Sequence, residues 1–178
     1  MIATLLRFAL ILSAIENPQT GNAMQAPPLA HINNTFRFEV AAPLERVAPL
    51  FGPEGERCWA GKHWDPQFVY PQPAKDVEGA VFTVAHGSHN SIWVNTIFDL
   101  HGGRMQYVSV IPEALVSVID VQLKAIDGSG TAVEVTYART ALAAAANDEV
   151  EAMAARDRDS GAEWREGVEG CLAGKPVR

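Results

Sequence analysis

The chain has 178 residues, of which 48% are hydrophobic and 20% are charged, and its mean hydropathy is +0.00. These values are typical of one soluble globular domain with enough apolar residues to form its own core. The formal net charge of −7 and the lack of a cluster of Lys and Arg exclude nucleic acid as a partner, because affinity for a phosphate backbone comes largely from basic side chains.

Residues 1–33 precede the regular pattern and are predicted to be an N-terminal extension, followed by a single domain over residues 34–178. The apolar stretch at residues 2–15 is too short to cross a membrane as a helix. It has some features of a weak signal peptide, while a start at Met24 is the alternative. We therefore expect a cytoplasmic protein without stable membrane insertion, or an exported one if residues 1–23 are a signal peptide.

The first regular element is a predicted strand at residues 35–40, where apolar and polar residues alternate. Pro43 then suits the first turn of a short helix at residues 44–51, whose apolar residues recur at helical spacing. A second short helical turn is expected at residues 54–60. These two short helices separate the first strand from the strands that follow.

Six further strands are predicted in series, each rich in Val, Ile, Thr and aromatic residues. They are expected at residues 67–71, 79–86, 91–100, 104–111, 115–126 and 131–142. Most of the joins between them are short and contain glycine, which is typical of hairpins. The sequence therefore predicts an antiparallel meander without crossover helices.

Alternation along these strands assigns one of their faces to the core. The inner face is predicted to carry Phe82, Val84, His86, Val94, Thr96, Phe98, Met105, Tyr107, Ser109, Ile111, Leu115, Ser117, Ile119, Val121, Leu123, Val133, Val135, Tyr137 and Arg139. Inward polar groups cost free energy unless they are hydrogen-bonded, so the hydroxyl groups and the arginine in this set are candidate ligand contacts. Arg139 is expected either to pair with Asp157, the interpretation we favour, or to bind an acidic group of a ligand.

One long helix is expected to close the domain, with Asn147 as its N-cap and its end near Leu172. Its apolar stripe is interrupted at Asp157, Ser160 and Gly161, which are small or polar. We expect this interruption to leave unfilled volume between helix and sheet. The alternative is that the glycine only kinks the helix or allows close contact with the sheet.

The order of elements and three segments carry a family resemblance. The segments are Phe-Glu-Val-Ala-Ala-Pro-Leu-Glu-Arg-Val at residues 38–47, Gly-Glu-Arg-Cys-Trp with the following Gly61 and Trp-Asp-Pro, and Tyr-Ala-Arg-Thr-Ala-Leu at residues 137–142. Over residues 34–172 the chain resembles the helix-grip proteins of the START-like or SRPBCC superfamily, and in particular uncharacterised bacterial polyketide cyclase/dehydrase-like proteins. The resemblance implies an α+β fold in which a curved antiparallel sheet of about seven strands wraps around a long C-terminal helix. It also implies a cavity for a hydrophobic ligand between that sheet and that helix.

The expected function is binding of a lipid, polyketide or aromatic metabolite in this cavity. The predicted pocket residues are Phe82, Val84, His86, Val94, Thr96, Phe98, Met105, Tyr107, Ser109, Ser117, Tyr137, Arg139, Met153, Asp157, Gly161 and Trp164. The alternative is a cyclase or dehydratase in which Tyr107, Tyr137 or His86 acts as acid or base. A third possibility is an interaction domain whose own side chains fill the cavity.

Other residues that could carry chemistry favour plainer interpretations. Cys58 and Cys171 are far apart in the sequence and are expected to be reduced, buried thiols. His86 and His89 flank a tight turn, but their spacing matches no metal-ligand motif. We therefore expect no metal, no cofactor and no catalytic motif.

Three tryptophans leave two interpretations open. Trp59, Trp64 and Trp93 could line the entrance to a cavity or anchor the short helices to the sheet. Trp164 in the closing helix is expected in the core, with a ligand contact as a second role.

Overall fold

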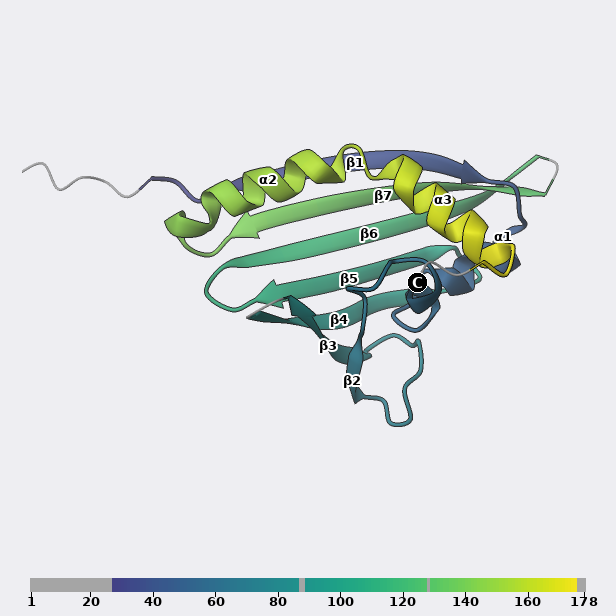
Figure 1. The fold of residues 1–178 in the computed structure, drawn as a ribbon, viewed down its shortest axis with the longest axis horizontal. Helices are drawn as coiled ribbons and strands as arrows, with labels where there is room; N and C mark the ends of the chain where they lie inside the picture. Colours follow the sequence, from purple (N-terminus) through teal and green to yellow (C-terminus); the bar gives the residue numbers. More distant parts are fainter. Residues whose placement is uncertain (1–26, 87–88, 128, 176–178) are drawn as a thin grey trace, which may run out of the picture.

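The computed structural model describes residues 27–86, 89–127 and 129–175, without the side chain of His86. Seven strands form one antiparallel sheet, and the helices pack against it (Figure 1). The strands are β1 (His31–Val40), β2 (Gln67–Tyr70), β3 (Val81–His86), β4 (His89–Asp99), β5 (Arg104–Ile111), β6 (Leu115–Ile126) and β7 (Gly130–Ala141). Their order in the sheet is β1-β7-β6-β5-β4-β3-β2, so the predicted meander is present and the first strand pairs with the last.

Short helices follow β1, and two longer helices follow β7. The first group consists of α1 (Leu44–Val47) and the 3-10 helices η1 (Ala48–Leu50) and η2 (Gly55–Cys58). The second group consists of η3 (Ala144–Ala146), α2 (Asn147–Asp157) and α3 (Gly161–Leu172). None of the helices in the described part of the chain is long and apolar enough to cross a membrane.

The C-terminal helical segment spans the predicted residues, but a turn at residues 158–160 divides it into α2 and α3. Helix α2 lies along β1 and β7, whereas α3 changes direction and runs from β1 towards η2 (Figure 1). Because the sheet is twisted, one straight helix would lose contact with it at one end. The turn allows both halves to bury a face.

Asn147 does not have the expected role of N-cap, because α2 continues from η3 and its N-cap is Ala146. The Asn147 side chain instead holds the segment before β1. Its Oδ1 accepts a hydrogen bond from the Ala30 N–H at 2.8 Å, and its Nδ2 donates to the Pro28 carbonyl at 3.0 Å. The structure thus uses this polar residue to join the two ends of the domain.

The predicted inner face is correct for most strands, including β5, β6 and β7. It is wrong for Val94 and Thr96 in β4, where Ser91 and Asn95 are fully buried instead. A β-bulge between Asn95 and Ile97 inserts one residue and restores Phe98 to the core. Strand β4 has apolar residues on both faces, so alternation did not reveal the register or the bulge.

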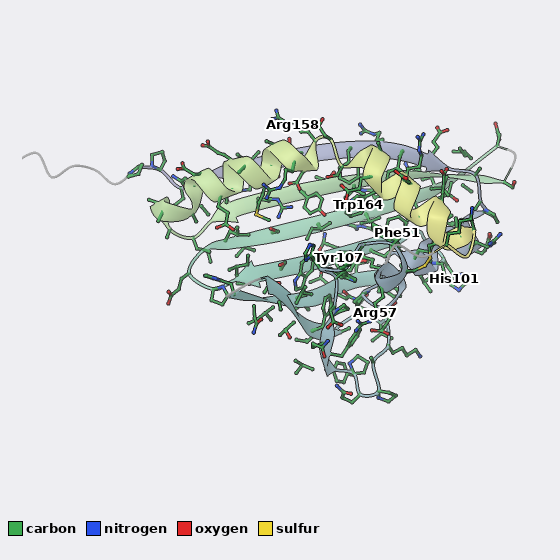
Figure 2. The ribbon with its side chains drawn as sticks, viewed as in Figure 1. Phe51, Arg57, His101, Tyr107, Arg158 and Trp164 are labelled. Atoms are coloured by element: carbon green, nitrogen blue, oxygen red, sulfur yellow. A yellow bond between two sulfur atoms is a disulfide. The ribbon has the colours of Figure 1, made fainter. Side chains whose placement is uncertain are left out.

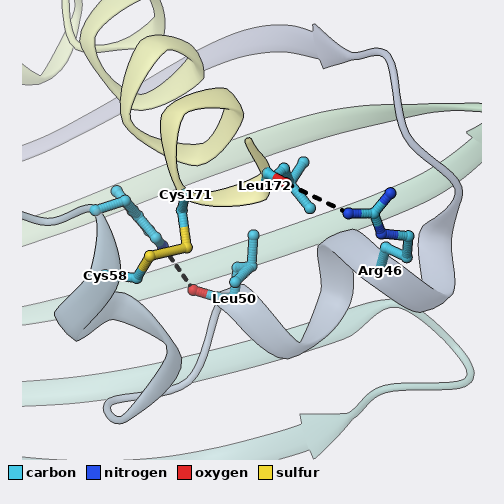
Figure 3. Close-up of a disulfide and its surroundings, with 6 residues drawn as sticks. Arg46, Leu50, Cys58, Cys171 and Leu172 are labelled. Atoms are coloured by element: carbon cyan, nitrogen blue, oxygen red, sulfur yellow. Dashed lines mark hydrogen bonds between the residues drawn. A yellow bond between two sulfur atoms is a disulfide. The ribbon is translucent and has the colours of Figure 1, made fainter. Parts of the chain in front are cut away.

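The two cysteines form a disulfide between η2 and the C-terminal end of α3, which corrects the expectation of reduced thiols (Figure 3). Cys58 and Cys171 are 113 residues apart in sequence, yet their Cα atoms are 5.7 Å apart. The helical segment after β7 runs back along β1 through α2 and α3 and so reaches η2, which follows β1, and sequence distance does not reveal this. The bond fixes η2 against the end of α3.

Candidate functional site

A pocket of about 170 Å³ lies between the inner face of the sheet, the η2 segment and α3. It is lined by Glu56, Trp59, Ala60, Trp64, Trp93, Tyr107, Ile119, Tyr137, Glu163 and Trp164. Tyr107 belongs to β5 and Trp164 to α3, on the two layers that enclose this space (Figure 2). Six of the lining side chains are aromatic, so the walls are mostly ring faces and edges.

Hydrogen bonds at the indole nitrogens fix three of the tryptophans. The N–H of Trp59 donates to the Leu50 carbonyl at 2.7 Å, and that of Trp64 donates to the Pro53 carbonyl at 2.9 Å. The N–H of Trp93 donates to a serine hydroxyl in the same strand at 2.7 Å. Because the polar edge of each ring is already satisfied, these tryptophans offer apolar surface to the pocket.

The rings also pack against one another in two groups. On one side of the pocket, the centroids of Trp59 and Trp164 are 4.9 Å apart. On the other side, Trp64 and Trp93 meet edge to face with centroids 5.2 Å apart. These rings therefore anchor η2 and its loop to the sheet and also line the pocket.

Glu56 is the buried carboxyl group in the pocket wall. It lies in η2 and is buried, with 7% of its surface exposed. Burial raises the pKa of Glu56 to about 8, a hydrogen bond from Tyr107 opposes the rise, and the charge of Asp76 adds to it. Asp76 in turn accepts hydrogen bonds from the backbone N–H groups of Glu54 and Gly55, which holds the start of η2 in place.

The Tyr107 hydroxyl lies between two acceptors and carries a single hydrogen. Its oxygen is 3.2 Å from Glu56 Oε1 and also contacts the Phe51 carbonyl. Burial raises the pKa of Tyr107 well above its usual value, so this hydroxyl keeps its proton. When Glu56 is protonated, Tyr107 can donate to Phe51 and accept from Glu56; when Glu56 is ionised, Tyr107 can donate to it. The Tyr107 hydroxyl can therefore form a hydrogen bond with either protonation state of Glu56.

Charge in the pocket is of one sign. Glu56 and Glu163 are the titratable carboxyl groups in its wall, and no Lys, Arg or His is among the described residues that line it. Elsewhere too, the described residues include no group of three or more His, Cys, Asp or Glu side chains that could hold a metal ion.

Three of the residues predicted for the pocket do line it: Tyr107, Tyr137 and Trp164. Trp164 also contacts Phe36 and Phe51, so it lies both in the core and in the pocket wall. Ile119 was assigned to the inner face and lies in the pocket wall as well.

Arg139 and Asp157 form a buried ion pair, as favoured from the sequence. Arg139 Nε is 2.6 Å from Asp157 Oδ2 and Nη2 is 2.7 Å from Oδ1, while Nη1 donates to the Ser117 hydroxyl at 2.9 Å. The guanidinium also lies over the Tyr137 ring, 4.4 Å from its centroid. These partners occupy the arginine, so it does not line the pocket.

The other predicted pocket residues lie elsewhere. Four are buried on the inner face of the sheet: Phe82, Val84, Met105 and Ser109. Phe98 packs against the main core, and Met153 packs against a second apolar cluster. Two lie on the outer face, Val94 and Thr96. Thr96 donates to the side chain of Gln106 there. The side chain of His86 lies outside the described residues.

The interruption in the helical stripe does not create the pocket. A Cβ atom on Gly161 would be 3.3 Å from the Arg37 carbonyl oxygen and 3.5 Å from a ring carbon of Phe36. The glycine therefore lets α3 approach β1 closely, which was the alternative interpretation. The pocket lies further along α3, where Trp164 faces the η2 segment.

Sequence reasoning missed Glu56, Ala60 and Glu163 as pocket residues. Glu56 had one signal, since it lies within the segment that carried part of the family resemblance. Nothing in the local pattern marks it as buried, because its neighbours Tyr107 and Asp76 come from β5 and from the loop before β3. Glu163 and Ala60 become neighbours of the site only when α3 packs on η2.

Solved structures with the same arrangement of elements have low sequence identity to this chain. An uncharacterised protein from Rhizobium leguminosarum is 16% identical with a TM-score of 0.59, over 83% of this chain and 97% of that chain. CalU16 from Micromonospora echinospora is 17% identical with a TM-score of 0.56, over 86% of this chain and 88% of that chain. Norcoclaurine synthase from Thalictrum flavum, in complex with dopamine and hydroxybenzaldehyde, is 8% identical with a TM-score of 0.58, over 84% of this chain and 91% of that chain.

The chain has the helix-grip fold that these solved structures share. This confirms the fold class and the resemblance drawn from the sequence, with one open sheet of seven strands and a C-terminal helix packed on it. No protein-family model and no curated protein matches the sequence. At these identities the helix-grip likeness extends to the fold, while ligand and activity have to be argued from the pocket itself.

Proposed function

We propose that the chain binds a small, largely apolar molecule in the pocket between the sheet, η2 and α3. The observation that carries this proposal is the ring of six aromatic side chains around a space of about 170 Å³. Ligand pockets are typically apolar with a few placed polar groups, and here Glu56 and Tyr107 are such groups.

The volume favours a molecule with a single ring. An engineered apolar cavity of about 150 Å³ holds benzene, whereas pockets for drug-sized ligands measure about 300–1,000 Å³. A long lipid or a fused polyketide would therefore have to extend out of this pocket. Binding of dopamine and hydroxybenzaldehyde by a protein with the same fold supports the smaller class, since each has one aromatic ring.

Titration with p-cresol, followed by tryptophan emission and calorimetry, tests the proposal. Ala60 lines the pocket, so Ala60→Phe should fill it and weaken binding of p-cresol at least tenfold. Ala162 is exposed on α3, and Ala162→Phe is the matched control that should bind as the unmodified chain does. Absence of binding by the unmodified chain, or equal binding by Ala60→Phe, would contradict the proposal.

A second candidate function is proton-transfer catalysis of the cyclase or dehydratase type in the same pocket. The observation that favours it is the buried Glu56 beside Tyr107, because a carboxyl group with a pKa of about 8 can both donate and accept a proton near neutral pH. The test is the turnover of a cyclase or dehydratase substrate by Glu56→Gln, which should be at least 100-fold slower than turnover by the unmodified chain. Glu163→Gln in the same wall is the control, and equal turnover by both variants would exclude this role for Glu56.

A further inference from the structure

The wall of the pocket combines aromatic rings with acidic groups, and both kinds of group attract cations. From the geometry we infer that the ligand is an organic cation, an ammonium group attached to or close to one ring, held by the tryptophan faces and by Glu56. This inference rests on the proposed function of the pocket and names the class of its ligand.

The first argument is the type of aromatic surface. Cations are attracted to the faces of aromatic rings, and tryptophan is the strongest of the three ring types. Four of the six aromatic side chains in the wall are tryptophans, and they come from the η2 segment, the loop after it, β4 and α3. Tyr137 already has a cation on one face, the guanidinium of Arg139 at 4.4 Å from its centroid.

The second argument is the sign of the charges. The described residues in the wall provide two carboxyl groups, from Glu56 and Glu163, and no basic side chain. A ligand with a carboxylate or phosphate would lack a partner and would face like charge, at a cost that rises in a poorly solvated site. An ammonium group would find both a carboxylate and ring faces there.

The third argument is the position of Glu56. Its side chain is buried and lines the pocket, and Tyr107 can turn its hydrogen towards the ionised form. The titratable and charged groups around it are Tyr107 from β5, Tyr137 from β7, Asp76 from the loop before β3, Glu54 and Arg57 from the η2 segment and Glu163 from α3. Arg57 is occupied by Glu54 and Asp65, at 2.8 Å and 2.6 Å. Glu56 therefore has no cationic partner among the described residues.

These contacts predict a dependence of binding on pH. Because the pKa of Glu56 is about 8, the empty site holds a neutral carboxyl group at pH 6. A bound cation favours the ionised form, so binding below pH 8 has to release that proton, and binding at pH 9 does not. Affinity for a permanent cation should therefore rise with pH, accompanied by proton release below pH 8.

The test compares phenyltrimethylammonium with tert-butylbenzene, two probes of the same shape that differ in charge. We expect phenyltrimethylammonium to bind at least tenfold more tightly at pH 9, with a smaller preference at pH 6. Glu56→Gln should lose most of the preference and retain tert-butylbenzene binding. Glu166→Gln, an exposed position on α3, is the matched control and should behave as the unmodified chain does.

Proton release is a second readout that needs no variant. Calorimetry of phenyltrimethylammonium binding at pH 7 in buffers with different ionisation enthalpies should show release of up to one proton. Equal binding of the two probes, or binding of the cation without proton release, would overturn the inference and leave the proposed function standing. If neither probe nor p-cresol binds, the proposed function fails with it.

Discussion

At the scale of single residues, the buried charged side chains of this chain are either paired with an opposite charge or left without one. Arg139 and Asp157 neutralise one another in a bidentate pair, whereas Glu56 has only a phenol and a nearby like charge. A buried carboxyl group without a cationic partner destabilises the folded state when it ionises. A residue of this kind is more often found at a functional site than in a purely structural core.

Glu56 gives a prediction on stability and pH. Its pKa is 4.5 in the unfolded chain and about 8 in the folded chain, so folded protein holds the proton more tightly. Its contribution to stability is complete below pH 4.5 and is lost as pH rises towards 8, at about 1.4 kcal/mol per pH unit. Glu56→Gln cannot ionise and should be more stable than the unmodified chain at pH 9 by several kcal/mol.

Urea unfolding of both proteins at pH 5 and pH 9 measures this difference. Exposed Glu163→Gln is the control and should follow the unmodified chain at both pH values. The same difference in unfolding free energy between Glu56→Gln and the unmodified chain at both pH values would show that Glu56 does not hold a proton in the folded state.

The Arg139–Asp157 pair predicts a strong asymmetry between single and double substitutions. Arg139→Met leaves a buried carboxylate without its partner and should cost about 3–5 kcal/mol of unfolding free energy. The double variant Arg139→Met with Asp157→Leu removes both charges and should recover most of this loss. Denaturant unfolding of the two single variants and the double variant measures the coupling, and additive losses would rule out a tight pair.

At the scale of elements, the division between α2 and α3 places the pocket. Helix α2 covers β1 and β7, while α3 turns towards η2 and brings Trp164 against Trp59. Gly161 and Gly167 permit this path, because each lies where a neighbouring segment comes close. The pocket wall thus depends on how closely α3 can approach β1 at one end and η2 at the other.

Gly167 tests that dependence. A Cβ atom there would be 3.0 Å from the Trp59 carbonyl oxygen and 3.3 Å from its Cβ. We expect Gly167→Val to cost about 1–3 kcal/mol through overpacking, although valine is the better helix former. Glu166→Val at the exposed neighbouring position is the control and should change stability by about 0.5 kcal/mol or less. Thermal unfolding of both variants measures these changes in stability. Equal losses of stability in the two variants would argue against tight contact of α3 with η2.

At the scale of the whole molecule, the Cys58–Cys171 disulfide joins the two segments that cover the inner face of the sheet. It closes a loop of more than 100 residues, which in the chain-entropy account stabilises the folded state by about 5 kcal/mol. Cys58→Ser with Cys171→Ser should therefore lower the melting temperature to that of the reduced protein. The double variant should show no response to dithiothreitol in calorimetry, and equal melting of oxidised and reduced protein would contradict the expected effect.

The disulfide also bears on the compartment. Disulfides persist in oxidising compartments and are rare in the cytosol. We propose that the chain works in an oxidising compartment, which favours the exported alternative over the cytoplasmic expectation.

Thiol alkylation of protein from the cells that produce it, with and without prior reduction, should label both cysteines only after reduction. Full labelling without reduction would support the cytoplasmic expectation.

Most strands of this fold could be predicted to within two residues, because they repeat apolar and polar side chains with a period of two between turns, whereas β1 begins four residues before its expected start. Bounds for β5 and β6 agree with those expected, and the inner faces of β5, β6 and β7 follow from alternation. Strand β4 was the exception, because Val94 looks like a core residue in sequence and the bulge after Asn95 leaves no local signal.

The sequence by itself determined the antiparallel meander and the helical C-terminal segment, since each depends on a local period, and it favoured the pairing of Arg139 with Asp157, which depends on two complementary charges. Only the tertiary structure decided the disulfide, the burial of Glu56 and the place of the pocket. Cys58 and Cys171 meet because α2 and α3 run back along β1 to η2, and Glu56 becomes buried where η2 packs on Tyr107 of β5. Such contacts join segments that are far apart in the chain, so they leave no periodic trace in it.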